Sequence, residues 1–273
     1  MVPCLPTASA LATGRNFTEV EIQPTPKKRW HLANHHAILR REEQEPDLPM
    51  TVTHAELDAL FAARHSCRAF RPDPVPREVI EQIITTARRV PSWCNAQPWQ
   101  LELVSGAETE KLRSALMEQA SAGVPSPDLP FPTSYTGVYQ DRRRETGWQL
   151  YEAVGVEKGD RVGSARQMME NFNLFGAPHC AIVSSPVELG GYGAIDCGAF
   201  YTAFAIAAET LGVASIAQAA VAGFGPFLHE YFGIGDDRMV LYAISFGYED
   251  TEHPANAFRT SRADLTDIVT WRG

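Results

Sequence analysis

The spacing of apolar residues predicts a series of helices across most of the chain. Residues three and four apart, such as Leu57, Leu60 and Phe61, mark the apolar face of an amphipathic helix. The capping-box sequence at residues 53–56 indicates where that helix begins, and Pro91 ends the next one. The predicted helices cover residues 54–64, 79–87, a stretch from 108 onward, 167–175, 196–211 and 226–232.

Strands are predicted where alternation or continuous apolar character replaces the helical spacing. Residues 100–104 alternate, residues 179–183 follow a helix-ending proline, and residues 238–246 are strongly apolar. A turn at Gly212 leads into a short extended segment that reaches Ala219. Helices and strands interleave with irregular spacing, which favours an α+β or mixed α/β fold over a regular doubly wound sheet.

Two regions lack the pattern of a core. Residues 1–49 are an irregular N-terminal extension, which we expect to be mobile or to lie as a strap over a neighbouring subunit. The start of this extension has no basic n-region and no apolar h-region, so we expect no signal peptide. In an alternative interpretation the functional chain begins at Met50. Residues 122–170 combine a Pro-rich loop with the aromatic and basic segment 135–151, which is either a solvated helix or a lid that shapes a substrate pocket.

The helix predicted at residues 196–211 is apolar nearly all round. Such a helix is expected to be buried on every side, at the centre of a domain or at a subunit interface. Tyr201, Thr202 and Glu209 interrupt it, and no apolar run in the chain approaches the ~20 residues that a membrane span requires. We therefore expect no membrane partner.

Composition narrows the class of protein further. The chain of 273 residues has 44% hydrophobic and 21% charged residues, which is ordinary for a globular protein. A net charge of −9 argues against a general nucleic-acid binder. The five Cys residues are widely spaced with no CxxC motif, which predicts reduced thiols and a cytoplasmic location. We expect Cys67 and Cys94 to be inert, small packing residues.

Two short polar clusters carry the candidate chemistry. Residues 64–68 combine two Arg, a His and a Ser, whose donors suit a phosphate. Ser92, Asn95 and Gln97 offer neutral donors and acceptors that suit the polar edge of a flat heterocycle. The chain has no GxSxG, HExxH or GxxxxGK[ST] motif, and its Gly190–Gly193 cluster lacks the GxGxxG order. This combination predicts a phosphorylated, ring-bearing cofactor that does the chemistry while the protein positions it.

Both clusters resemble motifs of the FMN-dependent nitroreductase family. Arg64-His65-Ser66-Cys67-Arg68-Ala69-Phe70 is similar to the family's opening motif R-R/H-S-x-R-x-F, and residues 91–99 are similar to its P-S-x-x-N-x-Q-P-W element. The similarity continues through residues 175–178, 196–219 and 246–248, and it closes at Arg262. It covers the chain from about Met50 to the end.

The resemblance implies an α+β fold with a mixed, mainly antiparallel sheet flanked by helices, in an intertwined homodimer with FMN at the subunit interface. It implies an FMN-binding domain at residues 50–273 with a lid or insertion at about 122–170. The FMN-binding residues that it implies are Arg64, His65, Ser66, Arg68 and Arg262 around the ribityl phosphate, Ser92, Asn95 and Gln97 at the ring or substrate pocket, and Ile216, Ala217, Gln218 and Ala219 along the isoalloxazine.

Simpler roles stay open for several of these residues. Arg68 could pair with an acidic neighbour, and His65 could be a cation at a helix C-terminus. Asn95 and Gln97 could stabilise a turn. Arg259 is offset from the phosphate-binding position of the family, so its role is open. Packing roles are equally open for Trp99, Tyr139 and Trp148.

The resemblance further implies a flavoenzyme that takes hydride from NADPH or NADH and passes it to a nitroaromatic or quinone acceptor in a ping-pong cycle, with no metal and no catalytic side chain. One competing interpretation is a reductive dehalogenase similar to iodotyrosine deiodinase, whose lid carries a Glu four residues before a Tyr. Tyr139 could match that Tyr, but Tyr135 replaces the Glu. A flavin-fragmenting enzyme of cobalamin ligand synthesis and a non-catalytic FMN-binding protein also stay open as interpretations.

Overall fold

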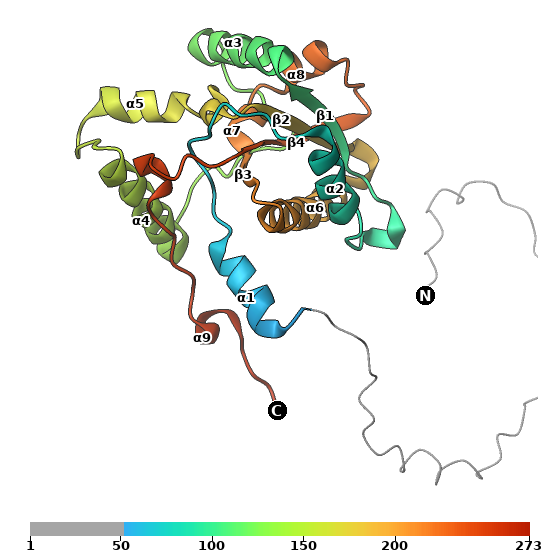
Figure 1. Ribbon diagram of the computed structural model, residues 1–273, viewed down its shortest axis with the longest axis vertical. Coiled ribbons are helices and arrows are strands. Elements are labelled where there is room, and N and C mark those ends of the chain that lie inside the picture. The colour runs from blue at the N-terminus through green and yellow to red at the C-terminus, as the bar shows by residue number, and fades with distance from the viewer. Residues whose placement is uncertain (1–51) are drawn as a thin grey trace, which may run out of the picture. The chain divides into compact units, whose positions relative to one another are not determined.

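The computed structural model describes residues 52–273, so the predictions for the extension at residues 1–49 lie outside the described residues. Most of the remaining chain forms regular elements around one sheet (Figure 1). The helices are α1 (His54–Ala63), α2 (Arg77–Ala87), α3 (Ala107–Ala122), α4 (Gly137–Ala153), α5 (Arg161–Met169), α6 (Gly190–Thr210), α7 (Ala219–Ala222), α8 (Gly225–Phe232) and α9 (Leu265–Ile268). Short 3₁₀ turns are η2 (Trp93–Asn95), η3 (Leu174–Gly176), η4 (Val187–Leu189) and η5 (Pro254–Asn256).

The sheet has four strands, β1 (Gln100–Ser105), β2 (His179–Pro186), β3 (Ala214–Gln218) and β4 (Arg238–Gly247). They lie in the order β1-β2-β4-β3, and each neighbouring pair is antiparallel. Parallel pairing within residues 52–273 is limited to isolated bridges such as Ser66 with Ser215. The predicted α+β class and the four predicted extended segments are therefore confirmed.

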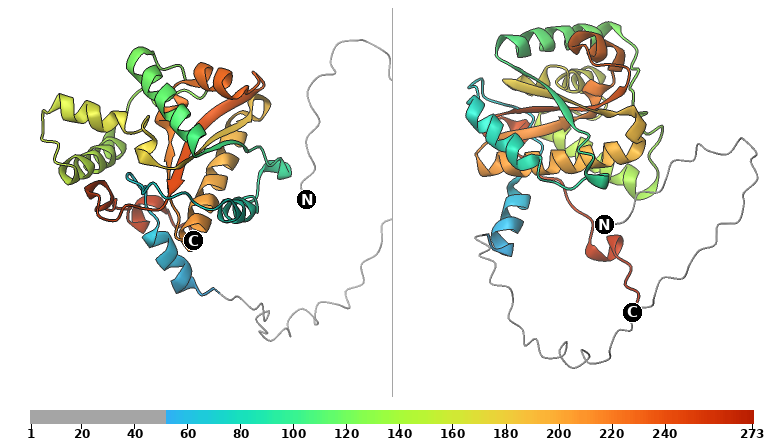
Figure 2. Two further views of the ribbon diagram at one scale, coloured as in Figure 1. Left: turned by 45° about the horizontal axis from the view of Figure 1, so that its top comes forward. Right: turned by 90° about the vertical axis from the view of Figure 1, so that its right-hand side faces the viewer.

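Helices cover both faces of this sheet, and Figure 2 shows the resulting layers, with α3 and α8 on one side and α2 and α6 on the other. Strand alternation divides the core accordingly, because successive side chains of a strand point to opposite faces. Ala181 and Val183 pack with α2 and α6, whereas Cys180 and Ile182 pack with α3 and α8. A strand buried on both faces reads as a continuous apolar run, which fits residues 180–183.

One irregularity changes the alternation in β4. The register between β2 and β4 shifts between Val183 and Ser184, so Val183 lies opposite Tyr242 but Ser184 lies opposite Val240. Because the bulge inserts one extra residue, the consecutive residues Leu241 and Tyr242 both face α2 and α6, while Val240 and Ala243 face α3 and α8. The sequence does not reveal such a bulge, because the residues on both faces of the strand are hydrophobic.

Helix α6 begins at Gly190 rather than at the predicted Asp196. Gly190 has φ +47, a conformation that glycine adopts without strain, so the glycine cluster starts the helix instead of forming a separate loop. Phe200 and Phe204 are fully buried against the sheet. The expectation of burial on every side is not met within this one subunit, because Ile195, Gly198 and Thr202 form an exposed stripe along the opposite face.

The helix predicted at residues 167–175 is wrong in its boundaries. Helix α5 spans Arg161–Met169, and the chain then turns through η3, where Leu174 and Phe175 have φ of 53° and 52°. The Phe175 N–H donates to the carbonyl of Glu170 at 2.9 Å, which closes the turn. Leu174 and Phe175 are buried, so tertiary packing overrides the local helical spacing here.

Helices α4 and α5 together form the part of the chain predicted as a lid or insertion. They lie at one side of the sheet, away from α2 (Figure 1). No residue of α4 is buried, and Ser261 donates to the carboxylate of Glu145 on this helix at 3.0 Å. Among the described residues, no helix has the length and apolar character for a membrane span, and no group of three acidic, His or Cys side chains is placed to hold a metal.

Candidate cofactor site

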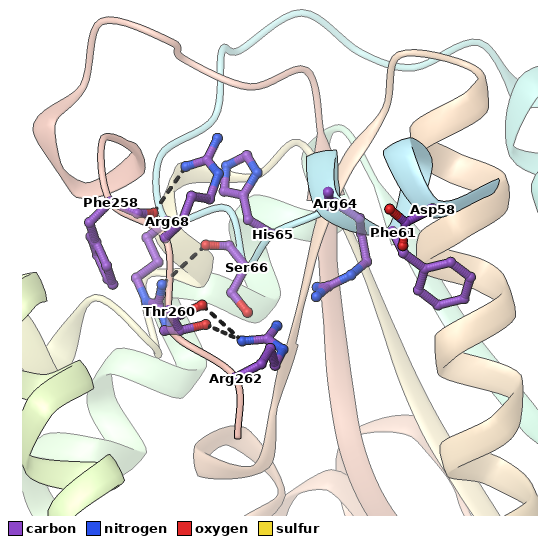
Figure 3. Close-up of a pocket in the computed structure, with 11 residues that line it drawn as sticks. Asp58, Phe61, Arg64, His65, Ser66, Arg68, Phe258, Thr260 and Arg262 are labelled. Atoms are coloured by element: carbon purple, nitrogen blue, oxygen red, sulfur yellow. Dashed lines mark hydrogen bonds between the residues drawn. The ribbon is translucent and has the colours of Figure 1, made fainter. Parts of the chain in front are cut away.

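A basic cavity of about 500 Å³ lies between the end of α1 and the segment that follows η5. Figure 3 shows the side chains of Arg64, Ser66 and Arg262 directed toward a common centre from these two segments. Each of the five predicted phosphate-site residues lines it. The complete lining is Asp58, Phe61, Ala62, Arg64, His65, Ser66, Arg68, Phe258, Arg259, Thr260 and Arg262. We call this space the phosphate cavity.

Asn256 fastens the two segments of the phosphate cavity together. Its side-chain oxygen accepts from the backbone N–H of Arg68 at 2.7 Å, and its amide donates to the carbonyls of Ala69 and Asp250 at 2.9 Å each. Asn256 is buried, and these three bonds give its side-chain oxygen and both of its amide hydrogens a partner. Residues nearly two hundred positions apart in sequence are therefore held side by side.

Arg68 is a partly buried cation of the phosphate cavity. Its guanidinium donates to the carbonyl of Ser66 at 3.1 Å and lies over the ring of Phe258 at 5.5 Å. Burial lowers the pKa of Arg68 from its usual value, but a guanidinium stays charged at any physiological pH. Within residues 52–273 it makes no ion pair, so the open role as partner of an acidic neighbour is not what this subunit shows.

His65 is already committed to protein partners. Its Nε2 lies 2.9 Å from a carboxylate oxygen of Glu249, and its Nδ1 lies 3.1 Å from the carbonyl of Ala63. Both partners are acceptors, so an N–H at either ring nitrogen is directed to the protein. The His65 ring therefore lies in the wall of the cavity with its nitrogens directed to Glu249 and Ala63.

The charge balance of this cavity favours an anion. Five of its lining residues are basic, namely Arg64, His65, Arg68, Arg259 and Arg262, against the single acid Asp58. Arg262 is held from one side by the hydroxyl of Thr260 at 2.7 Å. Guanidinium forks and a serine hydroxyl match the oxygens of a phosphate in both charge and geometry.

A second cavity of about 510 Å³ shares Arg68 with the first. One wall is the edge strand β3 and its continuation into α7, which places all four predicted isoalloxazine residues, Ile216 to Ala219, in its lining. Ala217 and Ala219 are exposed and small, so the wall is shallow. We call this space the ring cavity.

The residues of the β3 wall contribute different groups. The Ala217 N–H donates to the hydroxyl of Tyr201 on α6 at 3.1 Å. The Gln218 side chain is buried and accepts from Ser245 while it donates to the carbonyl of Asn171 at 2.7 Å. Gln218 therefore holds the wall in place with its side chain and can offer only its backbone to a ligand.

The opposite wall of the ring cavity comes from α4. Arg143, Arg144, Trp148 and Tyr151 line it, so the 135–151 segment, whose role the sequence leaves open, faces the same space as β3. Trp148 and Tyr151 pack edge to face with ring centroids 5.9 Å apart. An aromatic wall opposite small residues suits a flat ring or a stack of two rings.

The loop that carries Ser92, Asn95 and Gln97 lines neither cavity. The Ser92 hydroxyl accepts from the Gln97 N–H at 2.9 Å, and the Gln97 amide donates to the Asn95 carbonyl at 3.3 Å, so part of this cluster does stabilise a turn. Cys94, Asn95 and Gln97 all have positive φ, a strained conformation for residues other than glycine. Cys94 is exposed, so the expected packing role holds only for the buried Cys67, whose pKa burial raises to about 12.

The two motifs lie at opposite ends of α6. At its N-terminal end, Asp196 accepts from the Trp93 N–H at 3.0 Å. At its C-terminal end, burial raises the pKa of Glu209, and the nearby charge of His65 opposes that rise. The rise of 1.5 Å per residue puts about 20 Å between Asp196 and Glu209. One subunit alone therefore does not bring Ser92, Asn95 and Gln97 to the phosphate cavity.

Several residues that line the cavities or hold their walls have no local feature in the sequence that distinguishes them. Asn256, Phe258 and Thr260 lie within or after η5 in an irregular segment, where only the offset Arg259 resembles a phosphate ligand. Tyr201 is a polar interruption of an apolar helix as far as the sequence shows. These residues can be recognised only from their proximity in the folded structure, which sequence spacing does not predict.

The α+β fold and the two cavities that share Arg68 define a class of protein whose site suits an anionic group beside a flat ring. Known proteins of this class match the chain. Residues 61–248 match the model of the nitroreductase family. The nitroreductase NfnB of Mycolicibacterium smegmatis is 33% identical over 213 residues, which cover 78% of this chain and 91% of that protein. The chain belongs to the nitroreductase family of oxidoreductases.

A solved structure and a second relative support the same assignment. The crystal structure of FMN-dependent NfnB from Mycobacterium smegmatis in complex with NADPH superposes with a TM-score of 0.76 at 31% identity, covering 80% of this chain and 98% of that one. A 4-nitrobenzoate reductase of Pseudomonas putida is 29% identical, with 76% of this chain and 91% of that protein covered.

Proposed function

We propose that this protein is an FMN-dependent NAD(P)H oxidoreductase that reduces nitroaromatic or quinone-type acceptors. The observation that carries the proposal is the junction of the two cavities at Arg68. A basic cavity on one side and an aromatic-walled cavity on the other match the phosphate and the ring of one FMN. The solved relative that is FMN-dependent and binds NADPH has the same fold, which supports this choice.

The donor set fits the cofactor. Arg64, Ser66, Arg68 and Arg262 would hold the phosphate, and His65, bonded to Glu249, would form part of the wall beside them. Along the ring, the backbone from Ile216 to Ala219 would face the isoalloxazine. Ala219 is the first residue of α7, where a helix leaves backbone N–H groups without partners inside the helix.

A homodimer would complete this site. The exposed stripe of Ile195, Gly198 and Thr202 offers α6 a self-complementary surface, and glycine permits close approach. A two-fold axis across the stripe would pack two α6 helices antiparallel. The loop of residues 92–97 at the N-terminal end of one α6 would then reach the cavities at the C-terminal end of the other.

Other exposed apolar side chains support the same dimer. Leu57 and Phe61 of α1 are 43% and 49% exposed, and Leu265, Ile268 and Trp271 of the C-terminal segment are 60% to 82% exposed. Large apolar side chains left open on projecting elements are typical of interfaces. Figure 1 shows α1 and α9 both extending from the same side of the sheet layers.

The chain would support redox chemistry by position and charge. Bound FMN would supply the chemistry of hydride transfer from a nicotinamide nucleotide to the acceptor. The guanidinium of Arg68, at the junction, would stabilise negative charge that develops on a reduced ring. Trp148 and Tyr151 would stack the second ring and exclude water. Within the described residues, no Asp, Glu, His or Lys lines the ring cavity, so protons would come from solvent.

Anaerobic titration tests this proposal. The purified yellow protein is reduced with NADPH or NADH and then exposed to a nitroarene, a quinone or a halotyrosine. We expect bleaching of the flavin by a nicotinamide nucleotide and recovery with the nitroarene or the quinone. Recovery with the halotyrosine alone would favour the dehalogenase interpretation, and a protein that binds no flavin would exclude both.

A further inference from the structure

The ring cavity is strongly basic. Arg68, Arg143 and Arg144 line it, and none of the other lining residues in the described chain is acidic. Three cations without a counter-charge repel one another in a partly closed space. Such an arrangement is stable when a ligand supplies the missing negative charge.

Arg68 and the two arginines of α4 differ in what they can offer. Arg68 already faces the phosphate cavity and donates to Ser66. Arg143 lies over the ring of Tyr135 at 5.2 Å, a stacking contact that leaves its N–H groups free. Within residues 52–273, neither Arg143 nor Arg144 forms an ion pair. Both arginines are exposed, so their donors are accessible to a ligand that enters the cavity.

The placement of these arginines beside aromatic side chains indicates what the ligand looks like. Trp148 and Tyr151 lie on α4 next to Arg144, about one turn and two turns further along the helix. They would stack an aromatic ring at the place where a guanidinium fork meets a neighbouring oxyanion. A neutral aromatic compound would satisfy the rings but leave both arginines without an acceptor.

We infer that Arg143 and Arg144 bind an oxyanion carried by the substrate that stacks on the flavin, and so favour substrates that carry this group over those that lack it. The inference rests on the proposed function, because that function supplies the flavin. Two sources share this chemistry: a carboxylate on the aromatic acceptor, and the 2′-phosphate that NADPH carries and NADH lacks. Both match a guanidinium fork in the same way.

The test uses the FMN-loaded protein and substrates that differ in one anionic group. The Arg143→Gln, Arg144→Gln double variant is compared with Arg142→Gln, a neighbouring α4 arginine that lines neither cavity. Perturbation of the oxidised flavin spectrum gives Kd for 4-nitrobenzoate and for nitrobenzene. Initial rates of anaerobic flavin reduction give KM for NADPH and for NADH.

We expect the double variant to bind at least one anionic member, 4-nitrobenzoate or NADPH, about tenfold or more weakly, because it loses charge-assisted hydrogen bonds. For the other member of that pair, nitrobenzene or NADH, the Kd or KM should change less than about twofold. Arg142→Gln should change these constants for neither pair. The pair that responds identifies the source of the oxyanion. Equal effects on both members of each pair, or no effect, would overturn the inference. Failure of every nucleotide to reduce the wild-type flavin would instead overturn the proposed function.

Discussion

The two ends of helix α6 carry the two motifs that define this protein, and they differ in what one subunit makes of them. At the C-terminal end, residues 64–68 meet the segment after η5 and enclose a basic cavity. At the N-terminal end, residues 92–97 form a strained, exposed loop that lines neither the phosphate cavity nor the ring cavity. Residues of the first motif line a cavity within the subunit, whereas residues of the second motif line neither cavity and would reach one only in the proposed dimer.

Positive φ at Cys94, Asn95 and Gln97 sharpens that difference. Strained backbone persists only where surrounding contacts hold it, and it concentrates at functional sites. In this subunit the loop is held by the bond from Trp93 to Asp196 and by its own turn contacts. In the proposed dimer, this pre-shaped loop would contact the other subunit.

The largest expected effect is at the C-terminal end of α6. Arg68→Ala removes the cation shared by both cavities, so we expect FMN affinity to fall about a hundredfold, equivalent to about 3 kcal/mol. Quenching of FMN fluorescence on titration with apoprotein measures it. Arg71→Ala, which removes an exposed arginine paired with Asp73, is the control. Equal affinity for both variants would contradict a phosphate role for Arg68.

The second prediction concerns the stripe of α6. Ile195→Lys places a charge on a side chain that is 68% exposed in the subunit, so folding should be preserved while the proposed dimer dissociates. Sedimentation velocity measures the change from dimer to monomer. Val162→Lys alters a side chain of α5 that is 72% exposed and should leave the dimer intact. A dimer that survives Ile195→Lys would place the interface elsewhere.

A smaller effect on FMN affinity is expected at the N-terminal end of α6, where the loop of residues 92–97 lies. Asn95→Gly keeps the positive φ but removes the amide, and we expect about a tenfold loss of FMN affinity in the dimer. In the Ile195→Lys background the same change should have no additional effect, because the loop no longer reaches a cavity. A full loss of the same size in both backgrounds would mean that the loop acts within its own subunit.

The smallest effect on FMN affinity is expected at His229, which lies away from both ends of α6. Burial alone would lower the pKa of His229, but its bonds to Asp128 at 2.8 Å and to the Ile234 carbonyl outweigh burial and raise it. A raised folded-state pKa gives stability that is fully present below about pH 6.5 and is lost as pH rises through the folded value.

This sign gives a measurable pH dependence. His229→Gln should destabilise the protein by about 2 kcal/mol near pH 6 and by progressively less toward pH 9, with FMN affinity unchanged. Urea unfolding across this pH range measures it, and the exposed His54→Gln is the control. A constant difference across pH would show that the charge of His229 does not contribute.

Local sequence patterns predict much of the fold and the first of the two polar clusters of the site. Spacing locates α1, α2 and the strands, because each buries a regular face, and the cluster 64–68 is visible because its chemistry is contiguous. The bulge at Val183 and the turn at Phe175 are not predictable in this way, since both depend on packing between distant elements. Residues 64–68 and 92–97 are close together in the sequence, but in the structure they lie at opposite ends of α6. Asn256 joins the first cluster to a segment that no motif marks.

The central claim is that each site takes its phosphate cavity from one subunit and its 92–97 loop from the other. Mixed dimers test it directly. One chain carries Arg68→Ala, its partner carries Ser92→Ala, Asn95→Gly and Gln97→Ala, and separate affinity tags isolate the mixed species. If sites are shared, the mixed dimer has one intact site and retains about half of the wild-type FMN, whereas both parent homodimers retain far less. If the mixed dimer binds no more FMN than its parents, each subunit builds its site alone and the account is wrong.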